Sequence, residues 1–263
     1  MTEPNPAAAP LLTDHPCEGV VRLRLHRPEA RNALNTALRE ALADAFDKLD
    51  RDDRVRCVLL CGSDRVFAAG ADMKEIASLG AAGVSRLGVL RTWKAIAGFS
   101  KPLIAVVGGP ALGGGCELAL HADIILAGRS AMFGQPEVTV GIMPGGGATQ
   151  RLMRAVGKYQ AMRLMLTGLA VSADEAFAMG MVSEVVDDAA LDARALELAR
   201  LIASRPSMAL RLLKEAALAG ADAPLSTGLL LERRAFELLF DTADQKEGMQ
   251  AFADRRPAVF NGR

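Results

Sequence analysis

Hydrophobic residues along the chain fall into two patterns, short unbroken runs and longer segments with helical spacing. Runs of four to eight apolar residues are typical of buried strands. We expect such strands at residues 20–25, 55–61, 103–107 and 123–127. Apolar residues three and four positions apart predict helices at residues 35–49, 73–79 and 84–97, and a further helix from Glu117. Strands that alternate with helices in this way predict an α/β core.

The pattern after Thr149 is mostly helical. Apolar spacing predicts helices at residues 191–202, 208–218 and 225–240, with one strand at residues 182–186. Two helix starts have the spacing of a capping box, Ser172 with Glu175 and Thr242 with Gln245.

These patterns divide the chain into three parts. We expect a disordered tail at residues 1–17, an α/β core domain at residues 18–202, and a region of helices alone at residues 203–263.

One segment, KPLIAVVGGPALGGGCE at residues 101–117, carries most of the information on function. A buried strand leads into a corner of glycines, which let the backbone approach a ligand closely. The residues after the corner predict a helix start, where N–H groups lack partners and the positive end of the helix dipole lies. We therefore expect the Gly114 amide to face a developing oxyanion, with Glu117 one turn further along the helix.

Glycine corners of this kind also occur in nucleotide-binding loops and in structural turns. A phosphate loop needs Gly-Lys-Ser or Gly-Lys-Thr after its spacer, but Gly114 and Gly115 stand there instead. The dinucleotide fingerprint fails as well, because Leu118 occupies the place of its third glycine. A purely structural turn remains open from the local sequence alone.

Two further segments carry matching chemistry. In VFAAGADMKE, Asp72 is a plausible helix cap, so the Ala71 amide is a second candidate donor. Downstream, FGQPE places Glu137 twenty positions after Glu117. Two carboxylates in apolar surroundings suit general acid and general base work, because burial raises a carboxyl pKa and unequal neighbours can keep one carboxyl protonated. The combination favours a catalytic site over structural turns.

Composition limits the class of protein and its partners. With 263 residues, of which 51% are hydrophobic, the chain is large enough for a full-sized core. Lys and Arg total 31 and balance 31 Asp and Glu, so no basic field attracts nucleic acid or an anionic membrane. The longest uncharged run, residues 102–116, is too short to span a bilayer. The start MTEPNPAAAP has no basic or apolar stretch, so we expect no signal or transit peptide.

Cysteine and histidine suggest neither a disulfide nor a metal site. The four cysteines are Cys17, Cys57, Cys61 and Cys116. Their spacing favours buried thiols and a reducing, cytoplasmic location. His121 lies four residues after Glu117 and is placed only to modulate it. A Ser/His/Asp hydrolase is excluded, because the chain contains no G-x-S-x-G nucleophile elbow.

Several longer strings resemble the crotonase, or enoyl-CoA hydratase/isomerase, superfamily. They are HRPEARNAL at residues 26–34, FAAGADMKE at 67–75, ALGGGCELAL at 111–120 and FGQPEVTVGIMPGGGATQRL at 133–152. The likeness continues through LTGLAVSADEAFAMGMVSEVV to EGMQAFADRRPAVFNGR at the C-terminus, so it covers nearly everything after about residue 18. The resemblance implies the superfamily's ββα spiral core, followed by a helical C-terminal extension.

The resemblance implies an enoyl-CoA hydratase with four catalytic groups. The N–H groups of Ala71 and Gly114 would form an oxyanion hole for the thioester oxygen. Glu117 would act mainly as base on the water that attacks C3, and Glu137, protonated at rest, would deliver a proton to C2. Isomerases of the family keep only the second carboxylate, so the presence of both favours hydration. The alternatives are an enoyl-CoA isomerase and a non-catalytic acyl-CoA or RNA-binding member of the superfamily.

The resemblance also implies how coenzyme A is held, as part of the substrate and with no separate cofactor or metal. Arg27, Ala30 and Arg31 match a segment against the nucleotide end of CoA, although a solvated charged turn accounts for both arginines equally well. Ala69 would lie beside the pantetheine arm, and Phe260 would cap the adenine from a neighbouring subunit. The remaining expected contacts are Ala71, Asp72, Met73, Gly113, Gly114, Pro136 and Gly145.

Two narrower expectations follow from the same likeness. TWKAIAGFSKPLIA and GIMPGGGATQRLMRAVGK look like the bacterial 2,3-dehydroadipyl-CoA hydratases of phenylacetate breakdown. The helices of residues 203–263 would serve for trimer formation, giving a homotrimer or a dimer of trimers.

Overall fold

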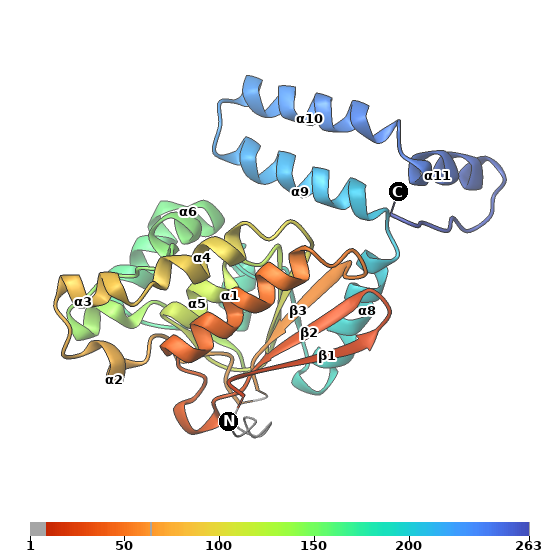
Figure 1. Ribbon diagram of the computed structural model, residues 1–263. Coiled ribbons are helices and arrows are strands. Elements are labelled where there is room, and N and C mark those ends of the chain that lie inside the picture. The colour runs from red at the N-terminus through yellow and green to blue at the C-terminus, as the bar shows by residue number, and fades with distance from the viewer. Residues whose placement is uncertain (1–8, 64, 263) are drawn as a thin grey trace.

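The computed structural model describes residues 9–63 and 65–262, which form a six-stranded sheet, a second sheet of three strands and the surrounding helices (Figure 1). The order of strands in the large sheet is β1 (Leu11–Cys17), β2 (Val20–Leu25), β3 (Cys57–Cys61), β4 (Leu103–Val107), β6 (Ile124–Gly128) and β9 (Glu184–Val186). β1 and β2 are antiparallel, and the pairs from β2 to β9 are parallel. The small sheet contains β5 (Ala111–Leu112), β7 (Met132–Gly134) and β8 (Val171–Ser172).

The helices connect the strands and then continue alone. Those of the first two thirds of the chain are α1 (Thr36–Asp50), α2 (Met73–Ile76), α3 (Ala81–Arg86), α4 (Val89–Ala97), α5 (Gly114–Ala119), α6 (Ala148–Thr167) and α7 (Ala173–Ala178). The later helices are α8 (Leu191–Ala203), α9 (Ser207–Ala221), α10 (Leu225–Leu239) and α11 (Ala243–Ala253). The short 3-10 turns Pro28–Ala30, Pro136–Val140 and Asp188–Ala190 complete the elements. The predicted α/β class is confirmed.

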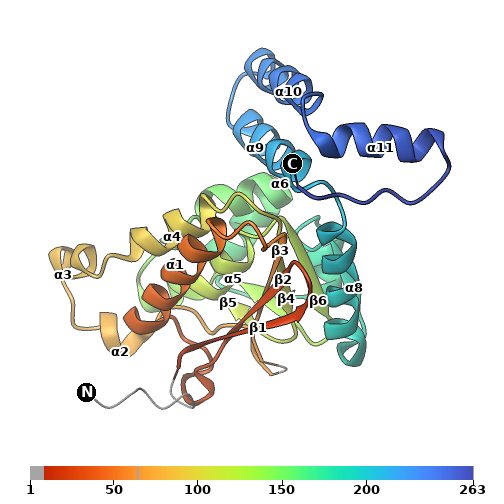
Figure 2. The same ribbon diagram turned by 45° about the vertical axis from the view of Figure 1, so that its right-hand side comes forward.

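The core lies on both faces of the large sheet, because every residue of β3 and β4 is buried. α1, α4 and α5 cover one face and α8 covers the other (Figure 2). On the first face Phe46 meets Phe99 edge to face, with ring centroids 5.1 Å apart. On the second face Ile104 and Val106 belong to a cluster with Leu191 of α8. Strands buried on both faces read as continuous apolar runs, which is why the sequence revealed them.

The structure corrects the sequence prediction at two places. The prediction of a disordered tail at residues 1–17 is wrong for Leu11–Cys17, because these residues form β1 and pair with β2. Residues 1–8 lie outside the described residues. The single helix expected at residues 84–97 is divided into α3 and α4. Gly88 lies between them with φ of +64°, a conformation that ends the first helix.

Helix starts follow the predicted caps. Ser172 and Glu175 form the complete capping box at α7, with reciprocal bonds between side chains and backbone N–H groups. Thr242 accepts from the Gln245 amide at the start of α11. Gln245 does not return a bond to Thr242 in the described chain, so the second box is half formed.

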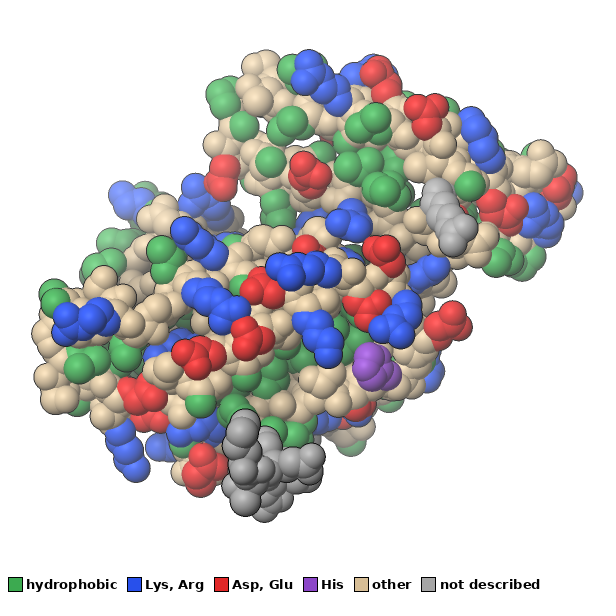
Figure 3. Space-filling model, viewed as in Figure 1, with side chains coloured by type: hydrophobic (Ala, Val, Ile, Leu, Met, Phe, Trp, Pro, Cys, Tyr) green, Lys and Arg blue, Asp and Glu red, His purple; other side chains and the backbone are tan. Residues whose placement is uncertain are grey.

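The last helices stand apart from the sheet. α9 and α10 form a hairpin, with α11 beside it (Figures 1 and 2). Neither α9 nor α10 contains a buried residue, and Figure 3 shows hydrophobic side chains on the surface of this hairpin. The exposed large side chains include Leu213, Leu218, Leu225, Leu229, Phe236 and Leu238. No helix in the described ranges has both the length and the apolar character needed to cross a membrane.

Candidate active site

Two backbone amides converge where the loops after β3 and β4 meet. Ala71 lies just before α2, and Gly114 is the first residue of α5. A Cβ atom built on Gly114 would lie 3.6 Å from the Ala71 nitrogen, and one built on Gly70 would lie 3.6 Å from the Gly114 nitrogen. Neither amide donates a hydrogen bond to another described residue. Two free N–H groups at one point can bind a single oxygen atom.

The convergence depends on glycine and on local backbone bonds. The Leu112 N–H donates to the Ala68 carbonyl at 3.0 Å, which ties the two loops together. A Cβ on Gly115 would overlap that same carbonyl, so only glycine allows this approach. Gly70 has φ of +104°, and its carbonyl accepts from the Leu34 N–H at 2.7 Å, which orients the following Ala71 peptide.

Glu117 lies one turn into α5 and is 3% exposed. Its Oε1 atom accepts from the N–H groups of Gly146 at 2.6 Å and Ala148 at 3.0 Å. Burial raises the pKa of Glu117, and these N–H groups act in the opposite direction because they stabilise the charged form. The N–H groups therefore offset part of the cost that burial places on the charged carboxylate.

Glu137 has a different environment. It follows Pro136 in the 3-10 turn after β7 and is half-buried. Burial raises its pKa to about 7, and the Glu117 charge raises it further. A Cβ on Gly113 would lie 2.7 Å from Glu137 Oε1, so Gly113, with φ of +52°, leaves the space this carboxyl occupies. Two neighbouring carboxyl groups with unequal environments can divide the roles of acid and base.

Three side chains near these carboxyl groups lay outside the predicted catalytic set. With its amide nitrogen turned toward Glu137, the fully buried Gln135 donates to both carboxyl oxygens at 3.2 Å. Trp93 and His121 stack beside Glu117, with ring centroids 5.1 Å apart. FGQPE contained Gln135, and the sequence placed His121 one turn after Glu117. No signal in the sequence pointed to Trp93, which comes from α4.

A cavity of about 500 Å³ is lined in part by the Gly145–Gly147 loop, whose Gly146 N–H donates to Glu117. Its apolar walls come from Leu90, Trp93 and Ala97. Its polar lining consists of Lys94, His121, Gln150, Arg151, Arg154 and Asp222. Arg154 pairs with Asp222 at 3.1 Å, whereas Arg151 has no ion pair among the described residues. The cavity therefore carries an excess of positive charge.

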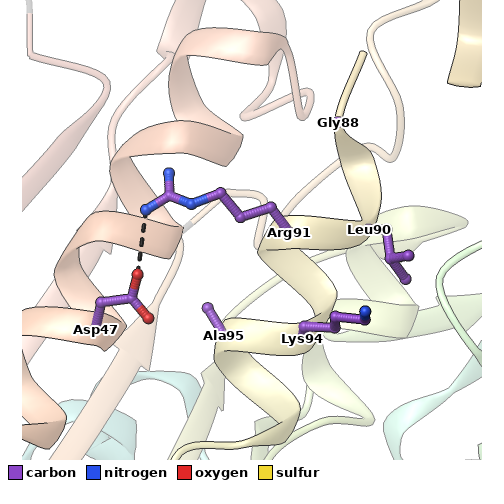
Figure 4. A pocket seen from close by; sticks show the side chains of 6 residues that line it. All are labelled: Asp47, Gly88, Leu90, Arg91, Lys94 and Ala95. Carbon is purple, nitrogen blue, oxygen red and sulfur yellow. Dashed lines mark hydrogen bonds and ion pairs between the residues drawn. The ribbon is translucent and has the colours of Figure 1, made fainter. Parts of the chain in front are cut away.

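The cavity between α1 and α4 is a different place. It is lined by Asp47, Gly88, Leu90, Arg91, Lys94 and Ala95, and Arg91 donates to Asp47 across it (Figure 4). It contains none of the four predicted catalytic groups, and its ion pair is exposed.

The structure brings most of the predicted CoA contacts to one end of the molecule. Two of them, Arg27 and Asp72, form an ion pair with each other. Arg27 Nη1 lies 3.0 Å from Asp72 Oδ2, and both side chains are largely buried. Asp72 also accepts from the Lys74 N–H as the cap of α2. The alternative of a solvated charged turn is wrong for Arg27, because its side chain is largely buried and paired with Asp72.

The neighbouring residues are more accessible. Ala30 ends a 3-10 turn, and Arg31 follows as an exposed residue with φ of +50°. Its carbonyl accepts from the Ala69 N–H at 3.0 Å, which places Ala69 beside this corner. Met73 begins α2 with an exposed side chain.

Phe260 is not brought to this end of the chain. Its ring lies against Gly248 of α11, and its carbonyl accepts from Arg56. The C-terminus runs beside the late helices, away from α2 (Figures 1 and 2). A contact of Phe260 with a neighbouring subunit's CoA stays a prediction.

The cysteines are free throughout the described chain, and three of them, Cys57, Cys61 and Cys116, are buried. Burial raises the pKa of each of these thiols to about 12, so they are unreactive. Within residues 9–63 and 65–262, no group of three or more His, Cys, Asp or Glu side chains is placed to hold a metal ion.

Comparisons with known proteins point to one family. The family model described as Enoyl-CoA hydratase/isomerase matches residues 16–263. A probable enoyl-CoA hydratase of Rhizobium meliloti (strain 1021) is 47% identical over 92% of this chain and 94% of its own. The 2,3-dehydroadipyl-CoA hydratase of Escherichia coli (strain K12) is 42% identical over 93% and 96%.

The fold comparison gives the same answer. A crystal structure of enoyl-CoA hydratase from Bacillus anthracis has a TM-score of 0.93 and 38% identity, covering 97% of this chain and 100% of that one. The predicted crotonase-like fold and the predicted family resemblance are both confirmed.

The unequal carboxyl environments give a prediction that needs no substrate. We expect Glu137 to titrate at about 7, and Glu117→Gln to lower that midpoint because it removes a neighbouring negative charge. Between its ordinary 4.5 and about 7, Glu137 binds a proton in the folded state that the unfolded state has lost, so the free energy of unfolding falls as pH rises through this window. Side-chain ¹³C NMR of labelled Glu measures both midpoints.

Glu175→Gln is the matched control, since Glu175 is exposed and caps α7 away from the site. It should leave the Glu137 midpoint unchanged. A Glu137 midpoint near 4.5 in the unmodified protein would contradict the assigned environment.

Proposed function

The chain belongs to the enoyl-CoA hydratase/isomerase family, and from this membership we propose that it is an enoyl-CoA hydratase that adds water across the C2–C3 double bond of a trans-2-enoyl-CoA. The observation that carries the proposal is the convergence of two free amides beside two carboxyl groups, one buried and one half-buried, both with a raised pKa. Addition of water to a conjugated thioester needs one oxyanion site, one base and one acid.

The oxyanion site would be formed by the Ala71 and Gly114 N–H groups. They would donate to the thioester oxygen as negative charge moves onto it from the attacked double bond. Removal of one such donor typically costs about 2.7–4 kcal/mol of barrier. Both donors belong to the backbone, so their alignment depends on the two loops and not on side-chain rotamers.

The two carboxyl groups would then move protons in a fixed order. Ionised Glu117 takes a proton from the water as its oxygen bonds to C3. Protonated Glu137 gives its proton to C2 as the enolate collapses, which leaves a 3-hydroxyacyl-CoA. A pKa of about 7 keeps a large share of Glu137 protonated near neutral pH, and the N–H groups of Gly146 and Ala148 favour the ionised form of Glu117. Because isomerisation needs one carboxyl group, the presence of both supports hydration.

Replacement of either carboxyl group tests the mechanism. Glu117→Gln and Glu137→Gln should each lower kcat by roughly 10² or more, because each removes a proton-transfer group. Loss of the conjugated-enone absorbance of crotonyl-CoA measures turnover. In the unmodified enzyme, kcat/KM should fall as pH rises through about 7, where Glu137 loses its proton.

Glu40→Gln is the matched control, because it makes the same exchange at an exposed position of α1 outside the site. It should leave kcat unchanged. Near-normal turnover by both Glu117→Gln and Glu137→Gln would remove the two carboxyl groups from the mechanism. Faster conversion of a 3-enoyl-CoA than hydration of crotonyl-CoA would favour the isomerase alternative.

We also propose a class of acyl group, one that ends in a carboxylate. The support is the cavity of about 500 Å³ lined by the Gly145–Gly147 loop. The walls of this cavity are apolar near Trp93 and cationic near Arg151. Arg151 is half-buried without an ion pair among the described residues, and burial lowers its pKa. An unpaired guanidinium in such a place favours an anionic ligand. The relative from Escherichia coli named 2,3-dehydroadipyl-CoA hydratase supports the same class of acyl group.

Arg151→Met tests the acyl group. It should lower kcat/KM for 2,3-dehydroadipyl-CoA by roughly 10-fold, the loss of one charge-assisted bond, and should leave kcat/KM for the uncharged 2-hexenoyl-CoA unchanged. Arg163→Met removes the same charge from an exposed position on the same helix and should change neither value. Equal effects of Arg151→Met on both substrates would contradict recognition of a distal carboxylate.

We propose a homotrimer, or a dimer of trimers, as the assembly. The support is the hairpin of α9 and α10, two helices of fifteen residues with no buried residue within one chain. Light scattering should give three or six times the chain mass of 27.7 kDa. Leu229→Glu with Phe236→Glu should lower that mass, because both side chains are about half exposed on the hairpin. A single chain mass for the unmodified protein would contradict the proposal.

A further inference from the structure

His121 occupies the end of the helix that carries Glu117. α5 ends at Ala119, and the His121 N–H bonds to the Leu118 carbonyl at 3.3 Å. The Glu117 carbonyl therefore lacks the donor that a continuing helix would give it. The His121 Nδ1 atom lies 2.8 Å from that carbonyl oxygen. Because a carbonyl can only accept, Nδ1 carries a proton.

The imidazole ring is also connected to the carboxyl group of Glu117, through Trp93 and Gly146. It stacks on Trp93 with an interplanar angle of 16°. Trp93 in turn packs against Gly146, where a Cβ atom would lie 2.5 Å from the indole ring. The Gly146 N–H donates to Glu117 Oε1 at 2.6 Å. The chain of contacts thus begins at the Glu117 carbonyl and returns to the Glu117 carboxylate.

We propose that His121 is a positioning residue for Glu117, which holds the glutamate at its backbone through Nδ1–H, while the stack on Trp93 keeps the ring in place for that bond. The inference rests on the proposed role of Glu117 as the base. His121 itself would transfer no proton in the reaction. Its contribution is the angle at which the Glu117 carboxylate meets the attacking water.

The environment of the ring agrees with a purely positional role. His121 is 8% exposed, and burial lowers its pKa to about 4, with the Arg151 charge acting in the same direction. Near neutral pH the ring is therefore uncharged and keeps one tautomer. A neutral ring can donate steadily to the Glu117 carbonyl across the pH range in which Glu117 and Glu137 act.

Two variants separate the donor from the ring. His121→Asn places an amide nitrogen near the Nδ1 position and removes the stacked ring, whereas His121→Phe keeps the ring and removes the donor. We expect His121→Phe to lower kcat for crotonyl-CoA hydration by roughly 10- to 100-fold with KM unchanged, because Glu117 loses its alignment. The acidic limb of its kcat profile should move to higher pH, since a misaligned Glu117 accepts less from Gly146 and Ala148. His121→Asn should retain most of kcat.

The controls keep the result interpretable. His15→Phe changes an exposed histidine of β1 and should leave kcat and the pH profile unchanged. Calorimetry should show that all three variants unfold cooperatively. Imidazole ¹⁵N NMR of the unmodified protein should show His121 protonated at Nδ1, a readout that needs no substrate. That measurement keeps the inference testable if a variant fails to fold.

The outcomes that overturn the inference are distinct from failure of the proposed function. His121 protonated at Nε2, unchanged kcat for His121→Phe, or equal loss in His121→Asn and His121→Phe would each reject the positioning role. An inactive unmodified protein, or full turnover by Glu117→Gln, would reject the proposed function while the NMR result still decides whether His121 caps the Glu117 carbonyl.

Discussion

The contact between Gly115 and Ala68 determines where the chemistry of this protein can occur. Gly115 comes so close to the Ala68 carbonyl that no side chain fits between them, and the Leu112 N–H bonds to the same carbonyl. The loops that follow two neighbouring parallel strands are therefore fixed against each other. The Ala71 and Gly114 amides converge as a consequence, and α5 starts at the point where its N-terminal N–H groups are free.

From that start, α5 carries Glu117 into the interior, where an ionised carboxyl group would be costly without donors. The Gly146 and Ala148 N–H groups supply them from a loop about thirty residues later in the chain. Burial also raises the pKa of Glu137, and the nearby Glu117 charge raises it further, which favours its protonated form. The two carboxyl groups thus differ in their surroundings, because one accepts from loop N–H groups and the other faces a neighbouring charge.

The rest of the fold holds these loops and leaves one surface uncovered. β3 and β4 are buried on both faces, so the strands that end at the site are among the most restrained parts of the molecule. The hairpin of α9 and α10 contains no buried residue within the chain. Asp222, in the turn of this hairpin, lines the same cavity as the Gly145–Gly147 loop. The proposed assembly surface and the proposed acyl cavity therefore lie next to each other at Asp222.

The sequence by itself determined the α/β class and the positions of the buried strands, and it indicated the two candidate glutamates, because continuous apolar runs and glycine corners are local signals. Such signals could not reveal β1, which is a half-exposed edge strand, or the break at Gly88. The tertiary structure alone decided that Arg27 pairs with Asp72 and that Trp93 stacks on His121. Each of these contacts joins segments far apart in the chain, and the position of His121 also depends on where α5 ends. Their energies depend on burial and charge in the folded protein, so the spacing of residues along the sequence does not predict them.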